Sequence, residues 1–209
     1  MTGENEPIAG SRLGMLVLAS GSATRARLLR RAGVPFRQDP AEIDEASAKA
    51  GLRQAGADAP TAALELARIK AATVAPRHPG RLVLGADQLL DCEGVWFDKP
   101  ASRAAAREQL LTLSGRRHHL ATAVVLLRDG APSWSHAQTP ELAMRRLSPA
   151  LVEAYLDAAG EAALSSVGAY QVEGLGAQLI ESLSGDFFTV LGLPLLPLLS
   201  ALRREGVLP

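Results

Sequence analysis

Residues 13–33 read LGMLVLASGSATRARLLRRAG, and this stretch decides the fold. Residues 13–19 form a continuous apolar run, which is typical of a strand buried on both faces. Polar residues follow at 20–22, and residues 23–32 have the spacing of a helix that ends at Gly33. A buried strand that leads directly into a helix indicates an α/β protein.

Strand and helix patterns alternate along the rest of the chain. We expect helices over 61–74, 102–113, 148–159 and 194–204, a buried strand over 81–86, and an extended piece at 34–36. We also expect a loop or strand end at 43–45, a hairpin over 88–97, two long strands over 118–127 and 133–147, and a short strand over 178–183. Because hairpins interrupt the alternation, these patterns predict a mixed, twisted sheet flanked by helices.

The composition excludes several classes of protein. Lysine plus arginine and aspartate plus glutamate both total 22, so bulk attraction to nucleic acid or to an anionic membrane is not expected. Cys92 is the only cysteine, which excludes an internal disulfide and favours a reducing compartment such as the cytoplasm. Residues 1–12 lack the features of a signal peptide and suggest a flexible polar tail before a single domain over 13–209. The longest apolar stretch, near 191–202, contains two prolines and is too short to cross a bilayer.

The loop Ser20-Gly21-Ser22 is the first candidate site. Backbone N–H groups at the start of a helix attract anions, and hydroxyls and the guanidinium of Arg25 suit phosphate oxygens. Two interpretations stay open: Ser22 only caps the helix, or the loop binds phosphate. The glycine pattern matches neither the Walker A motif nor the dinucleotide fingerprint.

Charged side chains supply the next candidates. Asp87 ends an apolar strand, where a carboxylate can bind a metal, orient water or simply cap a turn. Asp44 and Glu45 are either further acidic ligands or part of a solvated loop. Lys70 and Lys99 are notable because all but three of the 22 basic residues are arginines, although a surface position is the plainer interpretation of each.

The remaining candidates are weaker. Three glycines within residues 168–176 indicate a close backbone approach, either to a ligand or to another strand. His118 opens a strand, where a single histidine is more often structural than catalytic. Cys92 falls in a predicted hairpin turn and is a poor candidate nucleophile.

Five blocks, taken in order, resemble the Maf family of nucleoside triphosphate pyrophosphatases. They read LVLASGSATRARLL, LELARIKAA, LVLGADQLL with the following DKP, LSGRRHHLAT, and GAYQVEGLGAQLIESLSGDFFTVLGLPL. The resemblance spans about Leu16 to Gly206. It implies a Maf/ITPase-like α/β fold, with a mixed sheet and two lobes around a deep cleft. It also implies metal-dependent hydrolysis between the α- and β-phosphates, which gives a nucleoside monophosphate and pyrophosphate.

The resemblance also implies roles for individual residues. Asp87 matches the catalytic acid, a general base and metal partner, and Glu45 matches a second acid on the metal side. The positions that surround the phosphates are Ser20, Ser22, Arg25, Lys70 and Lys99. His118 and Thr122 fall on a recurring pair with a structural role. The implied cofactor is Mg²⁺ or Mn²⁺, and the implied partner is a nucleoside triphosphate, with no nucleic acid or membrane; the family is often dimeric.

Four positions bear on the phosphate contacts and on the choice of nucleotide. Ala23 and Thr24 depart from the usual family block, which has a proline at the first place and an arginine or aromatic residue at the second, so one phosphate or base contact is in question. Gln88 and Glu173 match the 7-methyl-GTP branch, whereas the dTTP/UTP branch has threonine and glutamine there. A carboxylate accepts from both guanine donors and favours a cationic base, although a cationic base also favours an aromatic face, which Thr24 lacks.

These positions favour a substrate like 7-methyl-GTP. The alternatives are a dTTP/UTP pyrophosphatase of the same family and a nucleotide-binding regulator of septum formation.

Overall fold

The computed structural model describes residues 16–209, so the predicted tail over 1–12 and the start of the first strand lie outside the described residues. The strands are β1 (Leu16–Leu18), β2 (Phe36–Gln38), β3 (Leu82–Cys92), β4 (Val95–Phe97), β5 (Arg117–Arg128), β6 (Ala131–Gln138), β7 (Glu141–Met144) and β8 (Ile180–Ser184). The α-helices are α1 (Ala23–Arg31), α2 (Glu45–Gln54), α3 (Ala59–Val74), α4 (Arg103–Leu113), α5 (Pro149–Ala159), α6 (Phe187–Val190) and α7 (Leu195–Arg204). Short 3-10 helices are η1 (Ala75–Arg77), η2 (Gly160–Ser165), η3 (Val167–Ala169) and η4 (Leu175–Leu179).

The predicted α/β class and mixed sheet are confirmed. Across the described residues, eight strands form one sheet in the order β2-β1-β3-β5-β7-β8, with β4 on β3 and β6 on β5. The β1–β2 and β1–β3 pairs are parallel, and the hairpin pairs are antiparallel. The described residues divide into two compact units, taken in turn below. Unit 1 comprises residues 16–87, 122–138 and 192–209, and unit 2 comprises 88–121 and 139–191.

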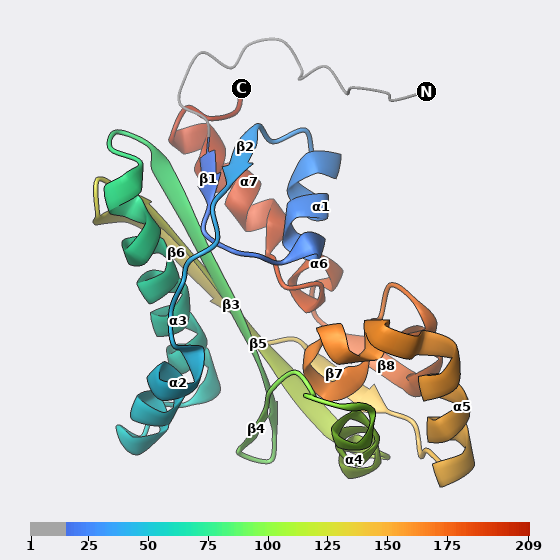
Figure 1. Cartoon of the computed structure of the whole chain (residues 1–209). Helices are drawn as coiled ribbons and strands as arrows, with labels where there is room; N and C mark the ends of the chain where they lie inside the picture. The colour runs from blue at the N-terminus through green and yellow to red at the C-terminus, as the bar shows by residue number, and fades with distance from the viewer. Residues whose placement is uncertain (1–15) are drawn as a thin grey trace. The chain divides into compact units, whose positions relative to one another are not determined.

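Unit 1 contains the parallel part of the sheet. Figure 1 shows α2 and α3 on one side of β1, β2 and β3, and α1 and α7 on the other. A Cβ at Gly85 in β3 would lie 2.0 Å from the Ala67 carbonyl oxygen of α3. Only glycine therefore allows α3 to pack this closely against β3. This packing fixes the distance between the α3 side chains and the strand.

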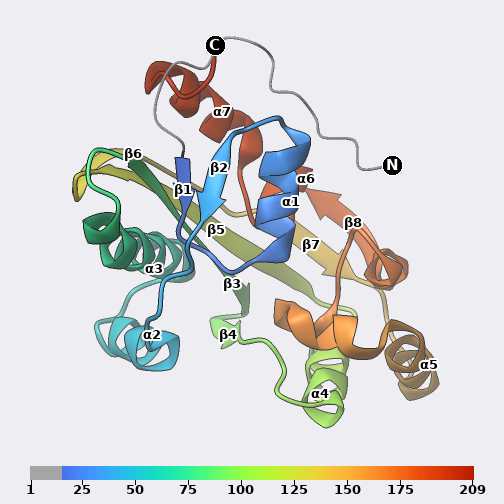
Figure 2. The ribbon, with the colours of Figure 1, turned by 45° about the horizontal axis from the view of Figure 1, so that its top comes forward.

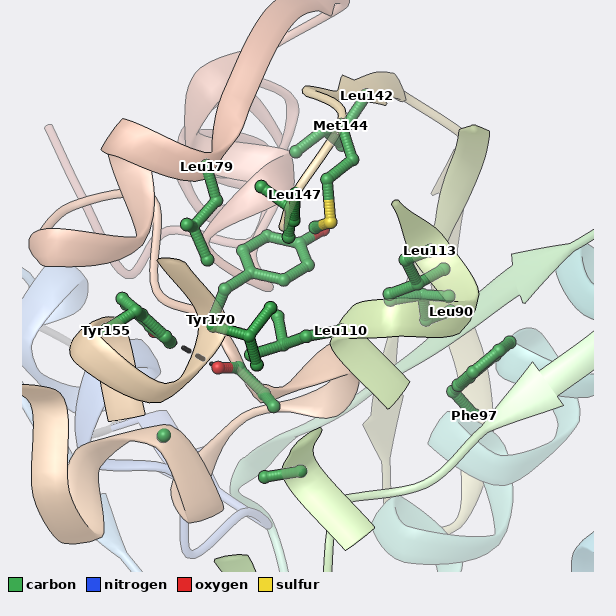
Figure 3. Close-up of a cluster of buried hydrophobic side chains, with 14 of the residues drawn as sticks. Leu90, Phe97, Leu110, Leu113, Leu142, Met144, Leu147, Tyr155, Tyr170 and Leu179 are labelled. Carbon is green, nitrogen blue, oxygen red and sulfur yellow. Dashed lines mark hydrogen bonds between the residues drawn. The ribbon is translucent and has the colours of Figure 1, made fainter. Parts of the chain in front are cut away.

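Unit 2 has a hydrophobic core of its own, to which β7, α4 and α5 contribute; Figure 2 shows these elements with β8 in a second view. The Tyr170 ring lies among the leucines of this core, near Leu110 and Leu147 (Figure 3). Its hydroxyl is 2.6 Å from Nε2 of His118, which is completely buried. The expectation of a structural role for His118 agrees with this position.

Three predicted elements need correction. Residues 43–45 are not a loop or strand end, because Asp44 caps helix α2 and Glu45 begins it. The strand expected to end near Ala86 continues to Cys92, so Asp87 lies within β3. The second long strand is divided into β6 and β7 around Pro140, which has no N–H to donate.

The helices expected over 61–74, 102–113, 148–159 and 194–204 are present within one or two residues. None of the helices in residues 16–209 combines the length and apolar character needed to cross a membrane.

Candidate functional site

The loop after β1 is held in place by its own serines. The Ser22 side chain accepts from the Arg25 backbone N–H at 3.3 Å and caps α1, and the Ser22 N–H donates to Ser20 Oγ at 3.3 Å. Ser22 is thus a helix cap, the plainer of the two interpretations. The first turn of α1 carries no acidic residue, so its N-terminal dipole is not neutralised locally and still favours an anion.

Arg25 lies beneath this loop and is buried. Its Nη1 donates to Ser20 Oγ and to the Ala86 carbonyl, both at 3.0 Å, and its Nε donates to the Gly192 carbonyl at 2.7 Å. Burial lowers the pKa of the Arg25 guanidinium, while the charges of Asp87 and Glu45 act in the opposite direction. The guanidinium therefore ties three segments of unit 1 together.

Lys70 joins the predicted catalytic acid, Asp87, to the predicted metal-side acid, Glu45. Its Nζ lies 2.6 Å from Asp87 Oδ1 and 2.8 Å from Glu45 Oε1. The side chains of Lys70 and Asp87 are only 9% and 6% exposed, whereas that of Glu45 is 47% exposed. The structure thus brings together three of the residues that the sequence analysis selected, and it does so from α3, β3 and the start of α2.

Glu45 is partly desolvated, which opposes its ionisation, but the hydrogen bond and charge of Lys70 outweigh this effect. Lys49, one helical turn further along α2, and Arg25 act in the same direction, and the pKa of Glu45 is lowered overall. Glu45 is therefore ionised at neutral pH. Asp44 is not part of this cluster, because its carboxylate caps α2 by accepting from the Ser47 N–H and hydroxyl.

Asp87 keeps one oxygen available. Its Oδ1 accepts from Lys70, but its buried Oδ2 has no hydrogen-bond partner. β1 pairs with β3 only as far as Leu84, so Asp87 lies beyond the end of the parallel strand β1, at the edge of the sheet from which the Ser20 loop leaves. Ligands of open α/β sheets bind at this edge, and a buried carboxylate oxygen without a partner is suited to a cation or a water molecule.

The carboxylate pair suits a hard divalent cation. Mg²⁺ prefers oxygen ligands and commonly binds through one or two carboxylates, substrate phosphates and water. Within residues 16–209, no three His, Cys, Asp or Glu side chains gather into a complete metal site. Asp87 and Glu45 are the two carboxylates of this site that could hold such a cation together with a phosphate ligand.

The other predicted site residues are in different surroundings. Thr24 is half-buried in the first turn of α1, while Lys99 and Glu173 belong to unit 2 and are exposed. Gln88 also belongs to unit 2, where its Nε2 donates to the Thr189 and Val190 carbonyls at 3.1 Å. The functional roles of these four residues stay predictions.

Packing accounts for two of the three glycines in residues 168–176. A Cβ at Gly168 would come within 2.6 Å of Leu90 Cδ1, and one at Gly176 within 2.5 Å of the Gln171 carbonyl oxygen. The predicted close approach is therefore to the protein's own chain at these positions.

Two further residues named in the sequence analysis have no accessible chemistry. Thr122 is buried on β5. Cys92 is the last residue of β3, and not in a turn, and burial raises the pKa of its thiol. A poor nucleophile is expected at Cys92, as the sequence indicated.

Two neighbours of the site escaped the sequence analysis. Gln38 Nε2 donates to the Ser20 carbonyl at 2.7 Å and so supports the loop from β2. Lys49 lies on the same face of α2 as Glu45. The signals that could have revealed them are the parallel pairing of Leu18 with Gln38 and the spacing of four residues on a helix.

Comparisons with known proteins agree with this geometry. The family model described as Maf-like protein matches residues 15–205. A "Nucleoside triphosphate pyrophosphatase" of Paramagnetospirillum magneticum is 52% identical over 92% of this chain and 99% of its own length, and one of Rhodospirillum rubrum is 49% identical over 92% and 96%. A "7-methyl-GTP pyrophosphatase" of Rhizobium etli is 48% identical over 92% and 97%. The family match covers nearly all of the residues that form both units, and this chain belongs to the Maf family.

Proposed function

We propose that this protein is a nucleoside triphosphate pyrophosphatase. It hydrolyses the bond between the α- and β-phosphates with the help of Mg²⁺ or Mn²⁺, and it prefers 7-methyl-GTP or a related modified nucleotide. The observation that carries the proposal is the position of Lys70 between the carboxylates of Asp87 and Glu45, with one Asp87 oxygen left without a partner. The names of the relatives from Paramagnetospirillum magneticum and Rhizobium etli support the same activity.

Asp87 is the base of the proposed reaction. Lys70 holds Oδ1, which fixes the carboxylate and leaves Oδ2 to align a water molecule and accept its proton. The water oxygen forms a bond to the α-phosphorus, the bond from the α-phosphorus to the bridging oxygen breaks, and pyrophosphate leaves with that electron pair. No covalent intermediate with a protein side chain is required.

The phosphates are bound by the loop and the lysines. The exposed start of α1 directs backbone N–H groups and a positive dipole end outward, without a competing carboxylate. Lys70 and, in our assignment, Lys99 stabilise the negative charge that develops on pyrophosphate as it leaves. Asp87 and Glu45 would hold a divalent cation, which would neutralise part of the charge on the phosphate oxygens.

The base preference rests on Glu173. Its carboxylate can accept from both the N1–H and the amino group of guanine, and the extra positive charge of a 7-methyl base strengthens the attraction. Gln88, which is hydrogen-bonded to the chain around α6, is the second residue that we assign to substrate choice.

We propose that the protein acts in the cytoplasm and needs no nucleic-acid or membrane partner.

The test is a product analysis in ¹⁸O-labelled water. The purified chain is incubated with 7-methyl-GTP, GTP, dTTP, UTP and CTP at equal concentration, with Mg²⁺ or Mn²⁺ and with a chelator. We expect the label in the monophosphate, unlabelled pyrophosphate, the fastest turnover of 7-methyl-GTP, and no turnover with the chelator. Release of a diphosphate and orthophosphate would refute the reaction, and faster turnover of the pyrimidines would refute the base preference.

The control for the catalytic residue lies on the same strand. Asp87→Asn should lower turnover about 10²- to 10⁴-fold, because the base is lost while the shape is kept. Asp91→Asn removes a carboxylate that only caps the β3–β4 turn through the Gly94 N–H, so it should retain activity. Equal activity of the two variants would contradict the role of Asp87.

A further inference from the structure

Two of the three nitrogens of the Arg25 guanidinium, Nε and Nη1, are hydrogen-bonded to the protein itself. Nε and Nη1 donate to three oxygens that lie 5, 61 and 167 residues away along the chain, in Ser20, Ala86 and Gly192. All three acceptors belong to unit 1, and the Arg25 side chain is buried among them. A buried guanidinium must satisfy its donors, so these contacts are costly to break in favour of a phosphate.

Two of the acceptors adjoin the reacting groups. The Ala86 carbonyl belongs to the peptide that leads directly into Asp87, so the hydrogen bond fixes the backbone from which the base projects. Ser20 Oγ receives both Arg25 Nη1 and the Ser22 N–H, so the same side chain also fixes the phosphate loop. Arg25 therefore sets the spacing between the loop and the base.

We infer that Arg25 is a positioning residue: through Nε and Nη1 it acts on the substrate by way of Asp87 and the Ser20 loop. This inference rests on the proposed function. The planar guanidinium reaches three acceptors in fixed directions, and a lysine ammonium at this position cannot replace it. The site therefore depends on the directions of the Arg25 hydrogen bonds as well as on its positive charge.

Charge and geometry can be separated with two variants. Arg25→Lys keeps the charge and loses the fork, and Arg25→Gln loses both. We expect both to lower kcat about 100-fold, with KM within about threefold of the wild-type value, since small misplacements of a base have effects of this size. Arg31→Lys and Arg31→Gln, on the exposed side of the same helix, are the matched controls and should leave both constants unchanged. Near-normal activity of Arg25→Lys, together with a KM raised about tenfold in Arg25→Gln, would overturn the inference.

A measurement on the unaltered protein covers the case in which the Arg25 variants do not fold. The Nε–H signal of Arg25 is followed by ¹⁵N NMR in the free protein and after addition of inorganic pyrophosphate with Mg²⁺. We expect slow hydrogen exchange in the free protein and no shift on addition of the anion. An exposed, fast-exchanging Nε–H that becomes protected only with pyrophosphate would refute the positioning role.

The two proposals can fail separately. If the wild-type chain releases no pyrophosphate from any nucleotide, the proposed function fails, while the exchange of the Arg25 Nε–H in the free protein still tests whether its contacts are fixed. If pyrophosphate is released and the Arg25 signal shifts with the anion, the inference fails and the proposed function stands.

Discussion

Lys70 Nζ lies 2.6 Å from Asp87 Oδ1, and both side chains are almost completely buried. The two residues are 17 positions apart and come from α3 and β3, which pack closely because residue 85 is a glycine. A charged group at this buried position of β3 is tolerated because its partner, Lys70, comes from the neighbouring helix. The fold and the proposed chemistry therefore depend on the same pair.

Lys70→Met should lower the free energy of unfolding by about 3–5 kcal/mol, because it leaves the Asp87 carboxylate buried without its charged partner. Urea unfolding at neutral pH measures this value. Arg68→Met removes an exposed ion pair with Glu65 on the same helix and should cost no more than about 1 kcal/mol. A Lys70→Met variant as stable as Arg68→Met would contradict the importance of the buried pair.

Gly85→Ala should destabilise the protein by about 3 kcal/mol, because the new methyl group would overlap the Ala67 carbonyl and push α3 away from β3. Pyrophosphate release should fall as well, since Lys70 moves with α3. Gly51→Ala in α2 is the control: nothing lies within 4 Å of its added methyl group, and better helix propensity should stabilise it by about 1 kcal/mol. The expected sign of the effect thus differs between two changes of identical chemistry.

His118 should make stability depend on pH. Burial, helped by the charge of His119 and opposed by the Arg116 backbone and Glu141, lowers the pKa of His118 to about 4. The unfolded chain binds this proton near the ordinary histidine pKa of about 6.5, whereas the folded chain binds it only near pH 4. The free energy of unfolding is therefore highest above pH 6.5 and decreases as the pH falls towards 4. Between pH 7 and pH 5 the loss is about 2 kcal/mol.

Urea unfolding of His118→Gln at pH 7 and pH 5 tests this dependence. Between these pH values, the free energy of unfolding of the variant should fall by about 2 kcal/mol less than that of the wild type. His119→Gln changes a half-exposed neighbour whose charge is a smaller cause of the shift than burial, so this variant should keep most of the wild-type dependence. If the His118 variant loses as much stability on acidification as the wild type does, another group is responsible.

Glu173→Gln should lower kcat/KM for 7-methyl-GTP by about 10- to 100-fold, the value of one or two hydrogen bonds to a charged acceptor. Turnover of dTTP should not fall, because an amide matches the mixed edge of a pyrimidine. Competition assays with both nucleotides give the ratio directly. Glu181→Gln, an exposed acid on β8, is the control, and an unchanged ratio in Glu173→Gln would remove that residue from the specificity site.

The sequence predicted the elements that bury an apolar face. The helices α1, α3, α4, α5 and α7 show this periodicity or a capping serine, and their bounds were close. Helix α2 was missed because it buries none of its residues, so its sequence has no apolar side to recognise. The continuation of β3 was missed because two consecutive polar residues, Asp87 and Gln88, are typical of the end of a strand. The ion pair with Lys70 that lets Asp87 stay buried is a tertiary contact, which the local sequence does not reveal.

The candidate site was predicted as a set of residues and not as an arrangement. The family resemblance selected Asp87, Glu45 and Lys70, and the structure joins them. It assigned Arg25 to the phosphates, and that role stays a prediction; it did not indicate that Nε and Nη1 of Arg25 donate to three protein oxygens. Such contacts join segments up to 167 residues apart, and no local pattern encodes them.

Helix α2 carries Glu45 while burying nothing, whereas Asp87 lies in a strand that is buried almost throughout. Substitutions near the two acids therefore differ in their cost to folding. A change along α2 costs little and can slightly shift Glu45, whereas a change beside Asp87 disturbs the buried strand. The position of Glu45 can therefore be adjusted by protein engineering, while that of Asp87 is fixed by the core.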